Sequence, residues 1–379
     1  MRRPVRALFL NENIGGHATV HHHLRAIAES RTDLELRVID VPPPGAVRKL
    51  AALEVPGLGR WDADLRPARY QLAQSAWVAR RLGRWLADTD VVHVYTHNVA
   101  LLSARALRSV PYVVTIDSTN DQSVRMQPAR APTRFTPASI ALIKPLERRV
   151  YRNAHRVVAN SEWAARSLRD TYGVPSDRIV VIPMGVPVPP AASAFQPSTP
   201  SSRRLPRIVF IGRRMERKGG NQLLRVHQGF LAHRSELVLV THDQVPPGRN
   251  VRVLNDVNPG DGQVDAVLAQ GDLLALPSRL DQWPNAVLEA MAAGVAPVVS
   301  NVGGLPTMVQ NGVTGIVLGD DSDDTLRAAL TGLLDNPART VSLGRAARAH
   351  VEAEVNVTST ANRLFDLVRQ SADLGRRPR

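Results

Sequence analysis

The sequence predicts an α/β protein made of two domains, each built around a parallel sheet. Its 379 residues are more than one compact core usually holds. Short apolar runs that suit buried strands alternate with stretches of helical periodicity along nearly the whole chain. A stretch rich in Pro, Ser and Ala at residues 187–204 interrupts this alternation, so we expect a linker between the domains there.

Composition narrows the classes of function. The chain has no cysteine, which excludes disulfides, cysteine–zinc sites and thiol nucleophiles and fits a reducing cytosol. It has no apolar run of about 18 residues, the length that a membrane-spanning helix needs. The first residues lack the apolar core and cleavage site of a signal peptide. We therefore expect a cytoplasmic protein.

The formal net charge of +14 is unevenly distributed. Residues 1–185 carry 27 Lys and Arg against 16 Asp and Glu, or +11, and the remainder carries 21 against 18, or +3. A basic N-terminal half suits an anionic membrane surface, an acidic acceptor or nucleic acid. Only three of the basic residues are lysines, a bias that a GC-rich genome also produces. Aromatic residues at 4% are too sparse for base stacking, so we expect no nucleic-acid partner and leave peripheral membrane contact open.

The N-terminal domain, residues 1–186, opens with a strand at 5–10, a glycine turn and a helix at 17–30. Gly15 and Gly16 in that turn would allow a ligand to approach the backbone closely, although they fall short of the full dinucleotide-binding pattern. The His21–His23 run does not predict a metal site, because consecutive helix residues point about 100° apart and cannot share one ion.

Polar residues end two further strands of this domain, at 91–95 and 111–116. His97 follows the first and Asp117 the second, at the edge where α/β sheets form ligand sites. Two interpretations stay open: a ligand pocket, or a buried, satisfied histidine beside an Asx-turn aspartate. The remaining expected elements of this domain are a strand at 34–41, an irregular stretch at 42–69, a helix at 70–87, a basic loop at 121–149 with a helix from about 139, a strand at 157–161, a helix starting at Ser161 and a strand at 179–182.

The C-terminal domain, residues 205–355, continues with strand–helix units, and residues 356–379 form a last helix and tail. The expected strands are 208–211, 237–240, 251–254, 273–276, 296–300 and 316–318, and the expected late helices are 324–335, 338–352 and 358–372.

The stretch from Gly212 to Gly220 follows the first of these strands. It reads Gly-Arg-Arg-Met-Glu-Arg-Lys-Gly-Gly and places Arg213 and Lys218 over a loop before a helix. Arg213 can pair bidentately with phosphate oxygens, and Lys218 adds a point charge. The pattern thus indicates a diphosphate site, the plain alternative being a solvated basic turn.

The stretch at 281–294, Asp-Gln-Trp-Pro-Asn-Ala-Val-Leu-Glu-Ala-Met-Ala-Ala-Gly, follows the strand at 273–276 and turns into a helix. Its first turn offers free backbone N–H groups and the positive end of the helix dipole, which suit a phosphate. These N–H groups belong to Asn285, Ala286 and Val287. Asp281 and Glu289 would repel a phosphate that touched them, so they are better placed to accept hydrogen bonds from hydroxyls. A ligand with phosphates in its middle and hydroxyls at both ends is a nucleotide sugar. The alternative is that this stretch is an ordinary helix start with an exposed acid on either side.

Together these stretches resemble glycosyltransferase family 4. The matching segments are the acid-x7-Glu of 281–289, the Gly-Arg-x4-Lys-Gly of 212–219, the Gly-Gly-x-Pro of 303–306 and the Ser-to-Val segment of 161–186. The resemblance implies the GT-B fold, with two Rossmann-like domains facing across a cleft and a last helix that crosses back to the first domain. It implies that the donor is bound by the C-terminal domain and the acceptor by the N-terminal one.

The resemblance also implies the roles of the site residues. Gly15 and Gly16 would face the donor phosphate, Arg213 and Lys218 would stabilise the departing diphosphate, and Gly212 would open their loop. Asp281 would contact the donor sugar and Glu289 the ribose. His97 and Asp117 would line the acceptor pocket near the anomeric carbon.

The expected function is a retaining glycosyltransferase that moves a hexose-type sugar from a nucleoside-diphosphate sugar to an acceptor hydroxyl of a glycan, lipid-linked or small molecule. No Asp-x-Asp motif follows a strand, so we expect neither metal nor cofactor. Three positions depart from the family pattern: Asp281 replaces Glu, Ile116 replaces His and Thr307 replaces Glu. They leave open a degenerate nucleotide-sugar-binding protein, and a nucleotide-sugar epimerase is the other alternative.

Overall fold

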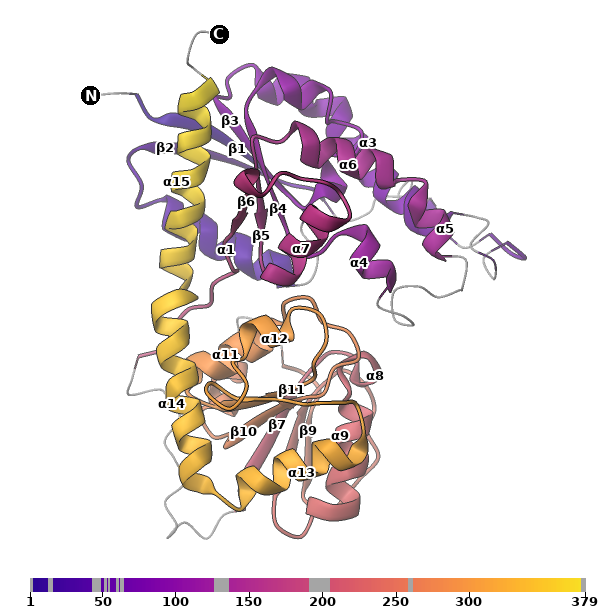
Figure 1. Ribbon diagram of the computed structural model, residues 1–379, viewed down its shortest axis with the longest axis vertical. Helices are drawn as coiled ribbons and strands as arrows, with labels where there is room; N and C mark the ends of the chain where they lie inside the picture. The colour runs from indigo at the N-terminus through magenta and orange to yellow at the C-terminus, as the bar shows by residue number, and fades with distance from the viewer. Residues whose placement is uncertain are drawn as a thin grey trace. The chain divides into compact units, whose positions relative to one another are not determined.

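The computed structural model describes residues 3–12, 16–42, 49–50, 53, 55–58, 61, 65–125, 136–190, 205–257 and 262–375. It divides the chain into two compact units, which are coloured by residue number in Figure 1. Unit 1 holds Met1–Pro183 together with Thr360–Arg379, and unit 2 holds Met184–Ser359. Gly15, most of the predicted linker at 187–204 and much of the predicted irregular stretch at 42–69 lie outside the described residues.

Unit 1 is built on a six-stranded parallel sheet in the order β2-β1-β3-β4-β5-β6. The strands are β1 (Val5–Asn11), β2 (Leu34–Asp40), β3 (Val91–Tyr95), β4 (Tyr112–Ile116), β5 (Arg156–Ala159) and β6 (Ile179–Val181). The central strands β3 and β4 are buried along their whole length, as strands covered on both faces are, whereas the edge strand β2 exposes Glu35 and Arg37. The order reverses between β1 and β3, and such a reversal opens a crevice at the carboxyl ends of the strands.

Successive residues of β1 serve the two faces of this sheet. Leu8 and Leu10 belong to the buried core formed with α3 (Arg66–Leu86) and α6 (Lys144–Asn153). Phe9 instead stacks on Phe365 of α15 (Val357–Gly375) at 6.0 Å between ring centroids. Arg31 donates to Asp366 of α15 at 2.8 Å, and His155 lies 2.9 Å from Ser371. The helices of unit 1 are α1 (Gly16–Ala28), α3 (Arg66–Leu86), α4 (Asn120–Arg125), α5 (Thr136–Ala141), α6 (Lys144–Asn153), α7 (Glu162–Asp170) and α15 (Val357–Gly375), with 3-10 turns at His97–Val99, Ala106–Ser109 and Ser176–Arg178.

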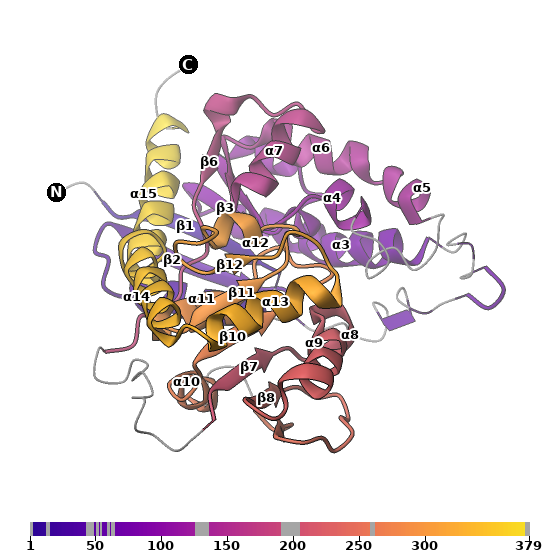
Figure 2. The ribbon, with the colours of Figure 1, turned by 60° about the horizontal axis from the view of Figure 1, so that its bottom comes forward.

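Unit 2 has a second six-stranded parallel sheet, in the order β12-β11-β10-β7-β8-β9. Figure 2 shows β10, β7 and β8 side by side in this unit. The strands are β7 (Arg207–Ile211), β8 (Glu236–Val240), β9 (Val251–Leu254), β10 (Leu273–Leu276), β11 (Ala296–Val299) and β12 (Ile316–Val317). The order reverses between β7 and β10, so the loops after these two strands meet at a switch point.

Helices cover the sheet of unit 2, and right-handed crossovers send those after β7 and those after β10 to opposite faces. The helices are α8 (Met215–Lys218), α9 (Gly220–Val226), α10 (Gln263–Leu268), α11 (Asn285–Ala293), α12 (Leu305–Met308), α13 (Asp323–Leu334) and α14 (Pro337–Glu354), with a π-turn at His227–Leu231. Gly294 adopts φ +83° and ends α11, as the sequence predicts.

The secondary structure follows the sequence prediction closely. Ser161 caps α7 by accepting from the Ala164 N–H at 3.1 Å, as its position before the helix predicts. In the described part of the chain, none of the helices is both long enough and apolar enough to cross a membrane.

Candidate functional site

The predicted diphosphate and acid motifs meet at the switch point of unit 2. Lys218 ends α8, in the connection that follows β7, and Asp281 lies in the loop after β10. The Lys218 Nζ donates to Asp281 Oδ2 at 2.6 Å, although 63 residues separate the two in the chain. Parallel β7 and β10 are hydrogen-bonded neighbours, which is why their following loops converge.

Two glycines allow neighbouring segments to pack closely against the loop after β10, Gly219 from the loop after β7 and Gly304 from the loop after β11. Gly219 adopts φ +76°, and a Cβ added there would lie 1.9 Å from the carbonyl oxygen of Pro277. A Cβ added to Gly304 would lie equally close, 1.9 Å, to the carbonyl oxygen of Gln282. No side chain fits at either position, so both glycines are required by close backbone approach as well as, for Gly219, by conformation.

The Lys218–Asp281 pair is largely removed from water. The exposed fractions of the two side chains are 12% and 5%. Burial is the largest influence on Lys218 and lowers its pKa, against the opposing effect of the Asp281 charge. Ser278 donates its hydroxyl to the same Asp281 oxygen at 2.9 Å, so the carboxylate is held from two sides.

Three arginines add to the cationic side of this loop, of which Arg214 pairs with Asp243 at 3.4 Å. The Arg217 guanidinium lies 3.9 Å from Asp281 Oδ1 and donates to the Leu280 carbonyl at 3.3 Å. Arg213 is exposed, and its guanidinium makes no ion pair with any residue that the structure describes. Arg213 is therefore the cation of this loop that an incoming anion can engage without displacing a protein partner.

The start of α11 differs from its prediction at one residue. Asn285 and Ala286 are half-buried at the first turn, with their N–H groups outside the helix ladder. Val287 was expected to offer a third free N–H, but it donates to the Pro284 carbonyl at 3.1 Å. Pro284 sets this tight turn, so two donors rather than three point out of the helix start.

Glu289 lies half-buried on the first part of α11. Burial, with a smaller contribution from the charge of Asp265, raises the pKa of Glu289 to about 7. A half-buried carboxyl group with a raised pKa and no ion pair among the residues that the structure describes is typical of a functional site. Thr307, which replaces a glutamate of the family pattern, is exposed and donates to the Gly304 carbonyl at 2.7 Å.

In unit 1, the residues after β1, β3 and β4 gather at the carboxyl edge of the sheet. Asp117 is half-buried, and its Oδ2 lies 3.4 Å from His17 Nε2 in the first turn of α1. The His17 ring also packs edge-on against the Tyr95 ring of β3, with 4.9 Å between the ring centroids. Burial by itself lowers the pKa of His17, but the hydrogen bond and charge of Asp117 and the charge of Glu12 outweigh it and raise the pKa.

His17 and Glu12 have no place in the sequence prediction. Glu12 is buried and accepts from the hydroxyl of Thr96 and from Asn98 Nδ2 at 3.2 Å. His21, from the triple-histidine run, is buried against Tyr95, and burial lowers its pKa to about 3. It is therefore neutral at physiological pH and packs as a core residue.

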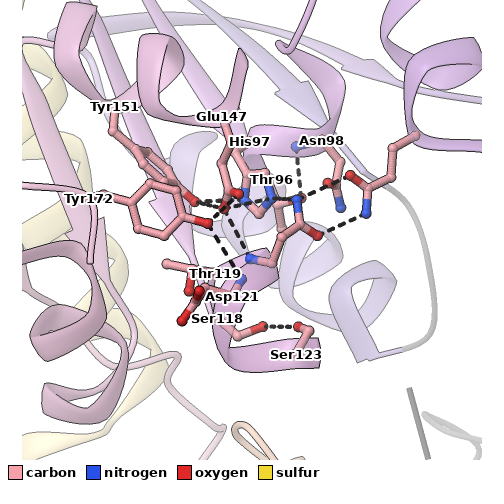
Figure 3. A network of polar contacts seen from close by, with 12 residues as sticks. Thr96, His97, Asn98, Ser118, Thr119, Asp121, Ser123, Glu147, Tyr151 and Tyr172 are labelled. Carbon is pink, nitrogen blue, oxygen red and sulfur yellow. Dashed lines mark hydrogen bonds and ion pairs between the residues drawn. The ribbon is translucent and has the colours of Figure 1, made fainter. Parts of the chain in front are cut away.

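His97 belongs to a buried polar network centred on Glu147, which Figure 3 shows. Its Nδ1 lies 3.0 Å from the Tyr151 hydroxyl, and its Nε2 lies 3.2 Å from Asn120 Nδ2 and 3.3 Å from Glu147 Oε1. Glu147 also accepts from the Tyr151 and Tyr172 hydroxyls. His97 is only 3% exposed, which is the geometry of the buried, satisfied histidine that the sequence left open.

His97 and Asp117, which the sequence grouped together, have different surroundings in unit 1. His97 lies within the buried network, whereas Asp117 lies at the half-exposed edge beside His17. Over the described ranges, no group of three or more His, Asp or Glu side chains is arranged to hold a metal ion.

Two parallel-sheet domains of this kind are the architecture of the GT-B glycosyltransferases. A family model described as Glycosyltransferase Family 4 matches residues 15–188, and one described as Glycosyl transferases group 1 matches residues 194–350. The chain belongs to glycosyltransferase family 4.

Known proteins agree with this assignment. The chain is 27% identical over 345 residues to a D-inositol 3-phosphate glycosyltransferase of Thermobispora bispora, covering 84% of this chain and 74% of that protein. A sucrose-phosphate synthase from Thermosynechococcus elongatus superposes with a TM-score of 0.70 at 17% identity, covering 97% and 98% of the two chains. Anabaena HepE in complex with UDP and glucose superposes with a TM-score of 0.65 at 16% identity, covering 96% and 99%. These two structures share the fold with this chain.

Proposed function

We propose that this glycosyltransferase takes a nucleoside-diphosphate sugar as donor, binds it on unit 2, and transfers a hexose-type sugar to an acceptor hydroxyl with retention of configuration. The observation that carries the donor assignment is the contact between Lys218 and Asp281 at the β7–β10 switch point. Arg213 lies in the loop after β7, and Glu289 lies in α11, the helix that follows Asp281. Two cations at this point suit a diphosphate, and two carboxylates on its flanks suit the hydroxyls of a sugar and a ribose.

The chemistry follows from where charge develops. As the bond from the sugar to the diphosphate breaks, negative charge grows on the leaving diphosphate. The exposed Arg213 guanidinium and the Lys218 ammonium would stabilise that charge more in the transition state than in the ground state, which is what accelerates a reaction. The two free N–H groups at the start of α11 would bind phosphate oxygens in the same way.

The acceptor would be bound by unit 1, at the edge where Asp117 and His17 lie. Asp117 is a carboxylate that can accept a hydrogen bond from an acceptor hydroxyl, and His17 holds its Oδ2 oxygen in place. The relative from Thermobispora bispora is named for inositol 3-phosphate, which is a ring polyol bearing a phosphate. A polyol of that kind is the first acceptor class to try on this chain.

Retention and independence of metal are part of this proposal. On the retaining route the donor phosphate takes the acceptor proton on the face from which the diphosphate leaves, and no carboxylate nucleophile forms a covalent intermediate. We also propose that the chain uses no other cofactor, because arginine and lysine supply the charge that a metal supplies elsewhere.

The test is a transfer assay with purified protein, a panel of UDP-, GDP- and ADP-sugars, and polyol and polyol-phosphate acceptors. We expect nucleoside diphosphate to be released with one donor only when an acceptor is present. Proton NMR of the product should show the anomeric configuration of the donor, and EDTA should leave the rate unchanged. An inverted product, or a rate abolished by EDTA and restored by a divalent ion, would contradict the respective part of the proposal.

A further inference from the structure

At the proposed donor site, Asp281 and the donor diphosphate compete for the same Lys218 ammonium. The Lys218 ammonium is needed by the diphosphate, yet it already donates to Asp281 Oδ2 at 2.6 Å. The pair is almost completely buried, with exposed fractions of 12% and 5% for the two side chains. A carboxylate this far from water cannot lose its cationic partner without a replacement, because an uncompensated buried charge is costly.

The groups around Asp281 cannot supply that replacement alone. Ser278 donates one hydrogen bond to the same oxygen at 2.9 Å, and the Arg217 guanidinium stays 3.9 Å from the other. Arg217 is also engaged with the Leu280 carbonyl at 3.3 Å. When a diphosphate draws on the Lys218 ammonium, Asp281 therefore loses its main partner and faces a new negative charge nearby.

We propose that Lys218 and Asp281 form a latch that distinguishes the intact donor from the nucleoside diphosphate left after transfer. The diphosphate competes with Asp281 for the Lys218 ammonium, and the hydroxyls of the donor sugar take the place on Asp281 that Lys218 gives up. The nucleoside diphosphate alone has no such hydroxyls. It leaves Asp281 under-satisfied, so it is bound less well and departs more readily.

This inference rests on the proposed donor site and adds to it a preference within that site. It assigns Asp281 two partners in turn, Lys218 in the free protein and sugar hydroxyls in the donor complex. The same Asp281 oxygen lies beside both the Ser278 hydroxyl and the Lys218 ammonium.

The test measures dissociation constants of wild type and Asp281→Asn by calorimetry at pH 7, for UDP, GDP and ADP and for their glucose conjugates. Removing the carboxylate charge removes the competition, so the nucleoside diphosphate should bind Asp281→Asn about fivefold or more tightly than wild type. The nucleotide sugar should gain nothing, because the neutral amide oxygen of the variant is a weaker acceptor for its hydroxyls than the carboxylate. The ratio of the two constants should change by at least about tenfold.

Other roles for Asp281 give different patterns. If Asp281 only positions Lys218, Asp281→Asn binds both ligands more weakly by the same factor, which overturns the latch. If it only contacts the sugar, the diphosphate affinity is unchanged and the nucleotide sugar weakens, which also overturns it. Failure of every nucleotide to bind wild type would instead overturn the proposed donor site, and the latch with it.

A matched control and a second variant keep the experiment decisive. Asp323→Asn removes an exposed carboxylate of unit 2 that pairs with Arg225 at 3.2 Å, and it should change neither constant. Ser278→Ala leaves Asp281 more dependent on Lys218, so nucleoside diphosphate should bind about threefold more weakly while the nucleotide sugar changes less. Opposite changes in the dissociation constant of the nucleoside diphosphate in Asp281→Asn and Ser278→Ala support the latch. Changes in the same direction contradict it.

Discussion

Replacing Glu289 with Gln should stabilise the free protein above neutral pH while damaging nucleotide binding. Burial raises the pKa of Glu289 to about 7 in the folded protein, from an ordinary value of 4.5. The folded state therefore holds a proton that the unfolded chain releases between pH 4.5 and 7, so stability falls as pH rises through that window. Above pH 7 the folded protein carries a desolvated, ionised carboxylate.

The size of this effect follows from the shift. A difference of about 2.5 pH units corresponds to about 3 kcal/mol at pH 8, as an upper bound for a half-buried side chain. A glutamine has no charge to desolvate, so Glu289→Gln should recover much of this stability at pH 8. For a domain of this size we expect a rise of about 3–10 °C in the unfolding midpoint at pH 8, and almost none at pH 5.

The assay is thermal unfolding of both proteins at pH 5 and pH 8, followed by circular dichroism, with Asp323→Asn as the exposed-carboxylate control. In the same buffers, nucleotide affinity of wild type should increase about tenfold from pH 6 to pH 8, since a ribose hydroxyl donates best to the ionised carboxylate. Equal midpoints for wild type and Glu289→Gln at pH 8 would refute the reasoning, as would a variant that still binds nucleotide like wild type.

Four further predictions concern the other residues of the two units. Lys218→Ala should lower turnover at least about a hundredfold in the transfer assay while circular dichroism stays unchanged, and a smaller loss would remove Lys218 from the diphosphate site. Asp117→Asn should lower the pKa of His17, measured by histidine NMR, because the hydrogen bond and charge of the carboxylate raise it. An unchanged pKa would show that Asp117 does not interact with His17. Glu147→Ala should destabilise unit 1 by about 3 kcal/mol in urea unfolding, since two tyrosine hydroxyls lose their buried acceptor, and a loss under about 1 kcal/mol would contradict the network. Gly219→Ala should abolish nucleotide binding, because its Cβ would lie 1.9 Å from a backbone oxygen; wild-type affinity would show that this close approach is not required.

Much of the fold could be predicted because it depends on local pattern. Most strands are short apolar runs that a sheet covered on both faces buries, and Ser161 and Gly294 mark helix ends by their own chemistry. The donor motifs were equally local, since Arg213 and Lys218 lie within one loop.

Contacts between distant parts of the chain could not be predicted in this way. His17 and Asp117 are 100 residues apart and are brought together only by the order of β1, β3 and β4. Glu147 lies in a helix of basic residues and looks like a surface charge in the sequence, yet it is fully buried. Its spacing of four residues from Tyr151 was the one local signal of that contact.

The most direct test of the donor site is a binding isotherm for UDP, GDP and ADP with wild type, Arg213→Ala and the surface control Arg225→Ala. Arg213 is an exposed cation of the loop after β7 with no ion pair among the described residues, and Arg225 is an exposed arginine of α9 in the same unit. We expect one nucleotide to bind wild type and Arg225→Ala alike and to bind Arg213→Ala at least about tenfold more weakly. Equal affinity in all three proteins, or binding by none of them, would contradict a diphosphate site at the β7–β10 switch point.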